Sequence, residues 1–310
     1  MNFKIFSGSS HEAFAQSICD QLKMPLGKTT IKTFSCGETY VKFEESFRGK
    51  DIFLVQTGRT GHMNNDLIEL LLLIDAAKRS FAEKIHVVMP YFPYSRQDKI
   101  HGPREGISAK LMANMIRQAG ADHVITMHLH SDQIQGFFDC PVDNLNPRRL
   151  FVEYFKKKNI KDPVIVSPDA GGAKEAKKFA DELGAPLVIL HKTRPSHNVS
   201  EVTHVIGDVA GKTPIIVDDM VDTAGSVCAA KQGLIDAGAN AEVYLATTHA
   251  IFSGPARERL TEANFAEIIA VDTLPVENPP KNFKTMSVAP LLADVIKNVA
   301  EKESVSKLYM

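Results

Sequence analysis

Two adjacent carboxylates, Asp218 and Asp219, end an apolar run and precede a turn of small and hydroxyl residues. Backbone N–H groups at the start of a helix can hold a phosphate, and the helix dipole favours the anion. Gly225 would let the backbone approach such a group, and Thr223 and Ser226 would add hydroxyl donors. Adjacent carboxylates would repel a phosphate, but they suit the vicinal hydroxyls of a sugar, or Mg²⁺. A sugar phosphate fits both halves of the pattern, whereas the plain alternative is a strand followed by a helix cap. The candidate residues for this ligand are Asp218, Asp219, Asp222, Thr223, Ala224, Gly225 and Ser226.

Two other apolar runs are followed by residues that could do chemistry. Asp169 follows Val164–Ser167 and precedes glycines and a helix, where its carboxylate could simply be a charge that stabilises the helix start. His128 and His130 follow Val124–Met127, and a period of two places both imidazoles on one face of a strand. A strand-end His can ligate a metal, although a single His is more often structural and Mg²⁺ prefers oxygen ligands.

Cationic side chains follow two further runs. Lys192 and Arg194 come directly after Leu187–Leu190, and their spacing lets both point the same way onto an oligophosphate. The polar, Pro-containing stretch that continues to residue 198 is typical of a mobile loop. In Arg96-Gln97-Asp98, the Arg could bind a phosphate and the Gln could hydrogen-bond an adenine edge. Taken alone, ordinary solvated turns explain both segments more simply.

The elements that must position these side chains alternate along the chain. Apolar, β-rich runs occur at Ile52–Gln56, Ile85–Met89, Val124–Met127, Val164–Ser167, Leu187–Leu190, Pro214–Val217, Val243–Ala246 and Ile268–Val271. Helical periodicity lies between several of them, at Asp66–Lys78, Ala173–Leu183 and Ser226–Ala237. Such alternation implies crossover connections and mainly parallel sheets covered on both faces. We therefore predict an α/β, Rossmann-like fold in which ligands bind beyond the carboxyl ends of the strands.

A repeated segment indicates two similar domains. Ala119–Val124 and Ala237–Val243 both read as a helix end, a tight turn with an Ala-Gly-Ala sequence, and a strand. The length of 310 residues also favours two domains. We predict domains at residues 1–147 and 148–310, with the last helix packing back on the first domain. Because Ala-Gly-Ala turns are common in α/β proteins, coincidence is the alternative explanation of the repeat.

The composition limits the class of protein. Lys and Arg total 36 against 37 Asp and Glu, and this balance argues against a protein built mainly to hold a nucleic-acid backbone. No apolar run approaches the length of a membrane span, and Met1–Ser10 does not resemble a signal peptide. The four cysteines have no metal-binding spacing, which predicts reduced thiols in a cytoplasmic protein.

With these motifs in place, the chain resembles the phosphoribosyltransferase superfamily and, within it, the ribose-phosphate pyrophosphokinase family. The resemblance rests first on Ile215–Ser226, which has the form of a phosphoribosyl-binding loop. It extends over nearly the whole chain through Phe34–Thr39, Pro93–Asp98, Gln133–Phe138, Val166–Gly172 and Ser304–Ser306. It implies two phosphoribosyltransferase-like domains, the first carrying ATP motifs and the second the ribose 5-phosphate loop.

The resemblance also implies a reaction and a role for each motif. ATP and ribose 5-phosphate would give AMP and phosphoribosyl pyrophosphate, with Mg²⁺ as cofactor. Lys192 and Arg194 would be the catalytic cations, and His130 and Asp169 would contact the metal. The residues implied for ATP binding are Phe34, Glu38, Arg96, Gln97, Asp98 and His130, the first two reaching the site from a neighbouring subunit. Members form dimers or hexamers, and many respond to phosphate and ADP at a separate site, matched here by Arg48, Arg104, Ser304 and Ser306.

Three residues of the nucleotide and metal regions depart from the usual pattern of the family, and a fourth, Gly106, stands near the effector positions where Pro or Ala is common. Cys36 replaces Asp or Asn, while His101 and His128 stand where Asp is common. These departures concern the nucleotide and metal sites, so two alternatives stay open. One is a catalytically silent regulatory paralogue, and the other is the same chemistry on a larger 5-phosphoryl ribose acceptor. The active synthetase is favoured by retention of Lys192, Arg194, Asp169 and the complete Asp218–Ser226 segment.

Overall fold

The computed structural model describes residues 2–196 and 199–308, with the side chains of residues 192–203 left undescribed. The chain forms two compact units. The first unit comprises Met1–Asn146, Thr273–Pro275 and Ser287–Met310, and the second comprises Pro147–Asp272 and Val276–Met286. Segments from both ends of the chain therefore build the first unit.

The first unit is organised around a five-stranded sheet in the order β1-β4-β5-β6-β7. Its strands are β1 (Phe3–Ser7), β4 (Asp51–Val55), β5 (Ile85–Met89), β6 (His123–Met127) and β7 (Val142–Leu145). Every neighbouring pair in this sheet is parallel. A separate antiparallel hairpin is made by β2 (Thr29–Thr33) and β3 (Thr39–Phe43). The carboxyl ends of the five strands thus lie along one edge, as ligand binding requires.

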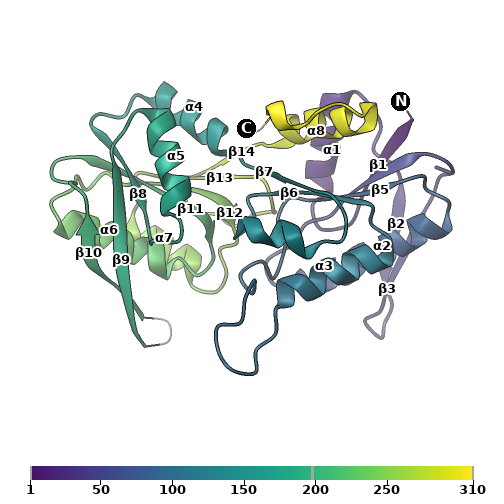
Figure 1. Cartoon of the computed structure of the whole chain (residues 1–310), viewed down its shortest axis with the longest axis horizontal. Helices are drawn as coiled ribbons and strands as arrows, with labels where there is room; N and C mark the ends of the chain where they lie inside the picture. Colours follow the sequence, from purple (N-terminus) through teal and green to yellow (C-terminus); the bar gives the residue numbers. More distant parts are fainter. Residues whose placement is uncertain (1, 197–198, 309–310) are drawn as a thin grey trace. The chain divides into compact units, whose positions relative to one another are not determined.

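Helices cover both faces of this sheet. α1 (Glu12–Leu22) and α8 (Ala289–Glu301) pack together on one face, while α2 (Met63–Arg79) and α3 (Ser108–Ala119) pack together on the other (Figure 1). Short 3₁₀ helices span Asp132–Phe137 and Ser306–Leu308. The α2–α3 side is closed by a core that includes Leu70, Leu73 and Ile116, all fully buried.

The second unit contains a seven-stranded sheet in the order β10-β9-β8-β11-β12-β13-β14. Its strands are β8 (Pro163–Ser167), β9 (Leu187–Ser196), β10 (Val199–Ile206), β11 (Thr213–Val221), β12 (Tyr244–Ala250), β13 (Glu267–Val271) and β14 (Phe283–Met286). Only the β9–β10 pair is antiparallel among the described ladders of this sheet. β11 is central, with β8 and β12 on either side.

Four helices cover the second sheet. α4 (Arg148–Lys158) and α5 (Ala173–Leu183) pack on one face, and α6 (Gly225–Asp236) and α7 (Ala256–Ala263) on the other (Figure 1). Gly184 ends α5 in the left-handed conformation at φ 75°, which glycine adopts without a steric penalty. The periodicity of Ala173–Leu183 therefore predicted both the helix and its end.

The α/β fold with mainly parallel sheets is confirmed, and each of the eight predicted strand segments overlaps a strand of the structure. Two local predictions were wrong. The stretch after Leu190, expected to be a loop, continues as β9 to Ser196, because β10 supplies an antiparallel partner for its backbone groups. The alternation expected of His128 and His130 does not occur, since β6 ends at Met127 and His128 is left-handed at φ 47°.

The four cysteines Cys19, Cys36, Cys140 and Cys228 are free thiols. Among the helices that the structure describes, none has the length and apolar composition needed to cross a membrane.

Candidate functional site

The central strand β11 positions the carboxylates of the Asp218–Ser226 segment, called the 218–226 loop below. Its first residues are buried, whereas Asp218 and Asp219 are half-buried. The sequence predicted both carboxylates to follow the strand. In the structure β11 runs to Val221, so both lie inside the strand, close to its end. The amide of Asp219 donates to Oδ1 of Asp218 at 3.0 Å, and the amide of Met220 donates to Oδ1 of Asp219 at 2.9 Å. Each carboxylate is therefore oriented by the backbone of the next residue.

The turn after β11 leads directly into α6. Ala224 is buried and left-handed at φ 60°, and the helix begins at Gly225. The first N–H groups of a helix have no partner within it, so this start can bind an anion. Asp222 is held from the side, because the hydroxyl of Ser253 donates to its Oδ1. The motif did not reveal Ser253, which comes from the end of the neighbouring strand β12.

Asp169 follows β8, the strand next to β11. Its Oδ1 accepts a hydrogen bond from the amide of Gly172 at 3.1 Å, and its carbonyl accepts one from the Ser167 hydroxyl at 2.7 Å. Asp169 is exposed and lies three residues before Gly172, the N-cap of α5. The helix-start interaction considered from the sequence is therefore present, and the exposed second carboxylate oxygen leaves room for a ligand.

Lys192 and Arg194 lie in β9, on the other side of β8, and their side chains fall outside the described residues. Lys192 pairs with Val202 of β10 in the backbone register. The parallel ladder between β8 and β9 ends at Ser167 and Ile189, so both cationic residues continue past the carboxyl edge of the sheet. The order β9-β8-β11 therefore brings three predicted segments to adjacent positions on one sheet edge.

In the first unit, Arg96, Gln97 and Asp98 follow β5, and His130 follows the adjacent strand β6. Arg96 and His130 are both exposed. The side-chain oxygen of Gln97 accepts a hydrogen bond from the hydroxyl of Ser108, so part of its amide is already engaged. Neighbouring parallel strands thus carry these candidates to the same edge of the first sheet.

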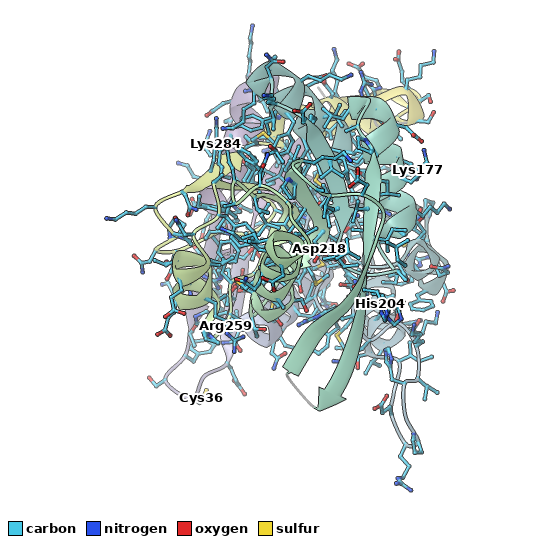
Figure 2. The ribbon with its side chains drawn as sticks, turned by 90° about the vertical axis from the view of Figure 1, so that its left-hand side faces the viewer. Cys36, Lys177, His204, Asp218, Arg259 and Lys284 are labelled. Atoms are coloured by element: carbon cyan, nitrogen blue, oxygen red, sulfur yellow. The ribbon has the colours of Figure 1, made fainter. Side chains whose placement is uncertain are left out.

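Phe34 and Glu38 lie on the separate β2–β3 hairpin. The amide of Phe34 donates to the carbonyl of Glu38 at 2.8 Å, which closes the turn. Phe34 is 53% exposed, and Cys36 stands at the exposed tip of the same turn (Figure 2). In Figure 1 this turn and the long loop between β5 and α3 extend from different ends of the first unit. An exposed aromatic ring on a projecting turn is suited to a contact outside its own sheet.

The effector candidates are distributed over the first unit. The guanidinium of Arg48 lies 4.5 Å from the ring centroid of Phe81, beside a cavity of about 550 Å³. The hydroxyls of Ser304 and Ser306 are 2.9 Å apart. Arg104 is exposed and left-handed at φ 70°. No hydrogen bond or ion pair among the described residues joins either arginine to the serine pair.

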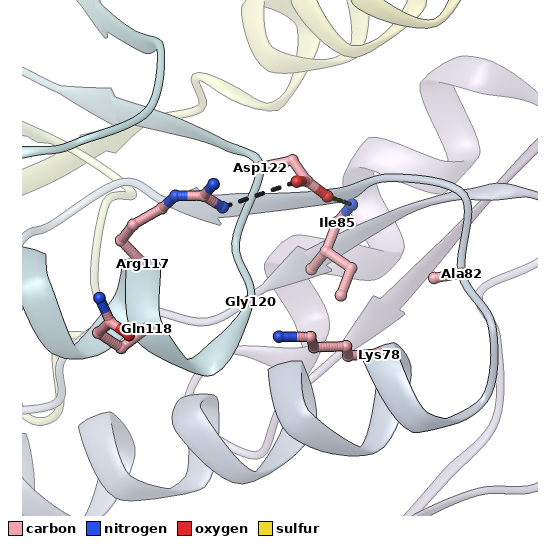
Figure 3. Close-up of a pocket in the computed structure, with 7 residues that line it drawn as sticks. All are labelled: Lys78, Ala82, Ile85, Arg117, Gln118, Gly120 and Asp122. Carbon is pink, nitrogen blue, oxygen red and sulfur yellow. Dashed lines mark hydrogen bonds and ion pairs between the residues drawn. The ribbon is translucent and has the colours of Figure 1, made fainter.

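A second cavity, of about 400 Å³, lies at the edge of the first sheet where the strands begin, opposite the carboxyl edge that carries the candidate residues (Figure 3). It is lined by Lys78, Arg117 and Asp122, among others, close to where β5 and β6 begin. Asp122 accepts a hydrogen bond from the amide of Ile85 at 3.0 Å and lies 3.7 Å from Arg117. Ligands of parallel sheets bind beyond the carboxyl ends of strands, so this cavity is not part of the candidate site.

Comparisons with known proteins point to one family along nearly the whole chain. Residues 3–120 match the family described as the N-terminal domain of ribose phosphate pyrophosphokinase, and residues 195–310 match the phosphoribosyl synthetase-associated domain. A ribose-phosphate pyrophosphokinase of Helicobacter hepaticus is 48% identical over 307 residues, covering 99% of both chains. The Bacillus subtilis protein of the same name is 45% identical and covers 99% of this chain and 97% of its own.

A crystal structure of phosphoribosylpyrophosphate synthetase from Mycobacterium smegmatis superposes with a TM-score of 0.92 at 41% identity. It covers 97% of this chain and all of its own. Identity of this extent and coverage leaves one assignment. The chain belongs to the ribose-phosphate pyrophosphokinase family.

Proposed function

We propose that this protein is a ribose-phosphate diphosphokinase, which transfers the β,γ-diphosphoryl group of ATP to the C1 hydroxyl of ribose 5-phosphate. The observation that carries the proposal is the 218–226 loop at the carboxyl edge of the central strand β11, in a chain related over its full length to proteins of that name. A helix start beside paired carboxylates is matched to a phosphate and to the hydroxyls of one sugar.

The 218–226 loop binds ribose 5-phosphate in this account. Thr223, Gly225 and the N–H groups at the start of α6 hold the 5-phosphate. Asp218 and Asp219 accept hydrogen bonds from the ribose hydroxyls, directly or through a metal. The backbone bonds that already orient both carboxylates support this role, because oriented acceptors lose less freedom when the sugar binds.

The transfer step forms one bond and breaks another. The C1 oxygen of ribose 5-phosphate attacks the β-phosphorus of ATP, the bond from that phosphorus to the α–β bridging oxygen breaks, and AMP leaves with that oxygen. The C1 hydroxyl loses its proton to solvent, since positioning and charge neutralisation dominate phosphoryl transfer. Lys192 and Arg194 of β9 neutralise the negative charge on the transferred group.

The donor set fits Mg²⁺ that arrives with ATP. The part of the chain that the structure describes contains no cluster of three or more His, Cys, Asp or Glu residues able to hold a metal. Mg²⁺ commonly binds through one or two protein carboxylates plus substrate phosphates. His130 in the first unit and Asp169 in the second would each be a protein contact for metal, which would supply charge neutralisation on the phosphate oxygens. Phe34, Glu38, Arg96, Gln97 and Asp98 bind the nucleotide in this proposal.

We further propose a homo-oligomer in which the hairpin residues Phe34 and Glu38 complete a neighbouring nucleotide site. Exposed apolar side chains support self-association. Ile68 and Leu72 lie one helical turn apart on α2, and Ile107, the cap residue of α3, lies four residues before Leu111. Arg48, Arg104, Ser304 and Ser306 would serve a phosphate or ADP effector. Sedimentation velocity tests the assembly, and a monomer at micromolar concentration would contradict it.

An assay of product formation separates this function from its rivals. Purified protein with ATP, MgCl₂ and ribose 5-phosphate should release AMP in proportion to the acceptor consumed. A regulatory paralogue would release none, and an enzyme for a larger acceptor would release AMP only when a larger 5-phosphoryl ribose replaces ribose 5-phosphate. Omission of MgCl₂ with added EDTA should abolish AMP release.

A further inference from the structure

The segment that joins β12 to α7, together with α7 itself, supports the 218–226 loop through successive carbonyls. Of three neighbouring carbonyls in the chain leaving β11, two accept a hydrogen bond from the joining segment and the third accepts one from α7. The pairs are Phe252 amide to Val221 carbonyl at 3.1 Å, Ser253 amide to Asp222 carbonyl at 3.0 Å, and Arg259 Nη1 to Thr223 carbonyl at 3.1 Å. The third bond differs from the others because a charged side chain supplies it. At Thr223 the side chain of Arg259 therefore supplies the hydrogen bond that backbone amides supply at Val221 and Asp222.

Arg259 also lies against the start of α6. A Cβ atom added to Gly225 would lie 3.3 Å from Nη1 of Arg259, which is a tight contact. Asp218 on β11 and Arg259 on α7 belong to the same unit, and Figure 2 labels both. α6 and α7 are also joined at the C-terminal end of α7, where the amine of Lys231 donates to the carbonyls of Ala263 and Asn264 at 2.6 Å each. One cationic side chain thus links α7 to the turn before α6, and another links α6 to the end of α7.

The charge of Arg259 is not neutralised by a carboxylate among the described residues. Arg148, in contrast, pairs with Glu175 and Glu182, and Arg59 pairs with Asp66. A cation beside a helix N-terminus is unfavourable, because the helix dipole places positive charge there as well. Such a placement becomes favourable when an anion binds between them.

We propose that Arg259 is a positioning residue for the 5-phosphate of the substrate, an inference that rests on the proposed function. It fixes the carbonyl of Thr223, and so the conformation in which residues 224–226 present their N–H groups. Its uncompensated charge raises the affinity of the loop for a phosphate dianion. Arg259 acts on binding and not on the transfer step, which takes place at the C1 end of the same sugar.

Two substitutions separate the geometric from the electrostatic role. Arg259→Gln removes the charge, and Arg259→Lys keeps it while losing the planar fork. Arg257→Gln is the matched control, because Arg257 lies on the same helix and donates to the carbonyls of Phe252 and Glu277, outside the 218–226 loop. Isothermal titration calorimetry with ribose 5-phosphate and with inorganic phosphate gives the dissociation constants, and steady-state kinetics gives kcat and both KM values.

We expect Arg259→Gln to raise the Kd and KM for ribose 5-phosphate by about tenfold or more, the size of one lost charge-assisted interaction. kcat and the KM for ATP should change less than about threefold, since uniform substrate binding is what is lost. Arg259→Lys should recover part of the affinity, and Arg257→Gln should leave it within about twofold, because neither carbonyl that Arg257 binds belongs to the 218–226 loop.

Equal affinities in wild type and Arg259→Gln would overturn the inference, and so would an equal loss in Arg257→Gln. A fall in kcat with unchanged KM would also overturn it. Thermal unfolding of each variant shows whether it folds. If Arg259→Gln does not fold, the inference is tested by Arg259→Lys alone, and wild-type affinity in that variant would overturn the geometric role. If the wild-type protein itself bound no ribose 5-phosphate, the proposed function would fail, and the wild-type titration shows this without any variant.

Discussion

Asp218 carries the most specific assignment at the scale of single residues. Its carboxylate is half-buried at the carboxyl edge of the central strand, and the amide of Asp219 already donates to one of its oxygens. Each carboxylate oxygen can accept more than one hydrogen bond, so Asp218 can also accept from a ribose hydroxyl. Asn in its place keeps the size and one acceptor but loses the charge that strengthens such a bond.

We predict that Asp218→Asn raises the KM for ribose 5-phosphate by about tenfold, as expected for a lost charge-assisted hydrogen bond. The KM for ATP should stay near its wild-type value. Initial rates at varied ribose 5-phosphate and saturating ATP provide the measurement, with Asp208→Asn as a control, because Asp208 is exposed and paired with Lys212. An unchanged titration of ribose 5-phosphate would rule out this role for Asp218.

Lys192 has a different predicted signature, because its charge is needed most when negative charge develops on the transferred group. We expect Lys192→Ala to lower kcat by about 100-fold or more, comparable to removal of one electrostatic donor, with little change in ribose 5-phosphate binding. Rapid-quench and calorimetric measurements on the same preparation give the two quantities. A raised KM with normal kcat would assign Lys192 to substrate binding instead.

At the scale of elements, the positions of the strands could be predicted from the sequence, but their ends could not. Apolar runs predicted the segments of β5, β8 and β11, because burial on both faces leaves a continuous hydrophobic signal. The run at β11 did not predict its end, since Asp218 and Asp219 are polar and still belong to the strand. Polar strand residues carry no such signal, so the boundary depends on pairing with β12.

Contacts between elements could not be predicted from spacing. Ser253 and Arg259 support the 218–226 loop through bonds that join residues about thirty positions apart. A single sequence contains periodicity and local motifs, whereas such bonds depend on which strands become neighbours. The sequence therefore predicted the residues of the loop and missed the residues that hold it.

A buried histidine pair links β5 to β6 and gives the fold a pH dependence. Nδ1 of His86 lies 3.1 Å from Nδ1 of His123, whose Nε2 lies 3.1 Å from Oδ2 of Asp143 on β7. Burial, and then the neighbouring His123 and Lys84, lower the pKa of His86 to about 3. Its pKa in the unfolded chain is near 6.5. Nε2 of His86 is buried without a hydrogen-bond partner.

Between these two pKa values the unfolded chain binds a proton at His86 that the folded chain does not bind. The free energy of unfolding should therefore fall as pH drops below about 6.5, by up to about 1.4 kcal/mol per pH unit from this group. His86→Val removes the titration, so its stability should depend less steeply on pH. Urea unfolding at pH 7, 6 and 5 tests this, and parallel curves for the two proteins would contradict it.

At the scale of the whole molecule, the near balance of charge hides a local separation. Lys and Arg number 36 and Asp and Glu number 37, yet the proposed phosphate contacts are Arg96, Lys192 and Arg194. The proposed sugar and metal contacts are Asp169, Asp218 and Asp219. Two anionic substrates require cationic side chains, and a divalent cation requires carboxylates. A net charge close to zero is therefore compatible with a site that binds highly charged ligands.

Each unit carries one half of the proposed chemistry at the carboxyl edge of its own parallel sheet. In the first unit, β5 and β6 carry nucleotide candidates, and in the second, β9, β8 and β11 carry the sugar-phosphate and catalytic candidates. Family membership rests on the entire length, since the relatives cover 99% of the chain. The central claim is therefore about the reaction of the intact protein.

Phosphorus NMR of the reaction products tests that claim most directly. With ATP, MgCl₂ and ribose 5-phosphate, the account predicts resonances of AMP and of a diphosphate bonded to C1 of the ribose, formed in equal amounts. The Asp218→Asn and Lys192→Ala proteins should slow their appearance without changing their identity. Release of ADP or of free pyrophosphate in place of this pair, or unchanged substrates with a folded wild-type protein, would contradict the account.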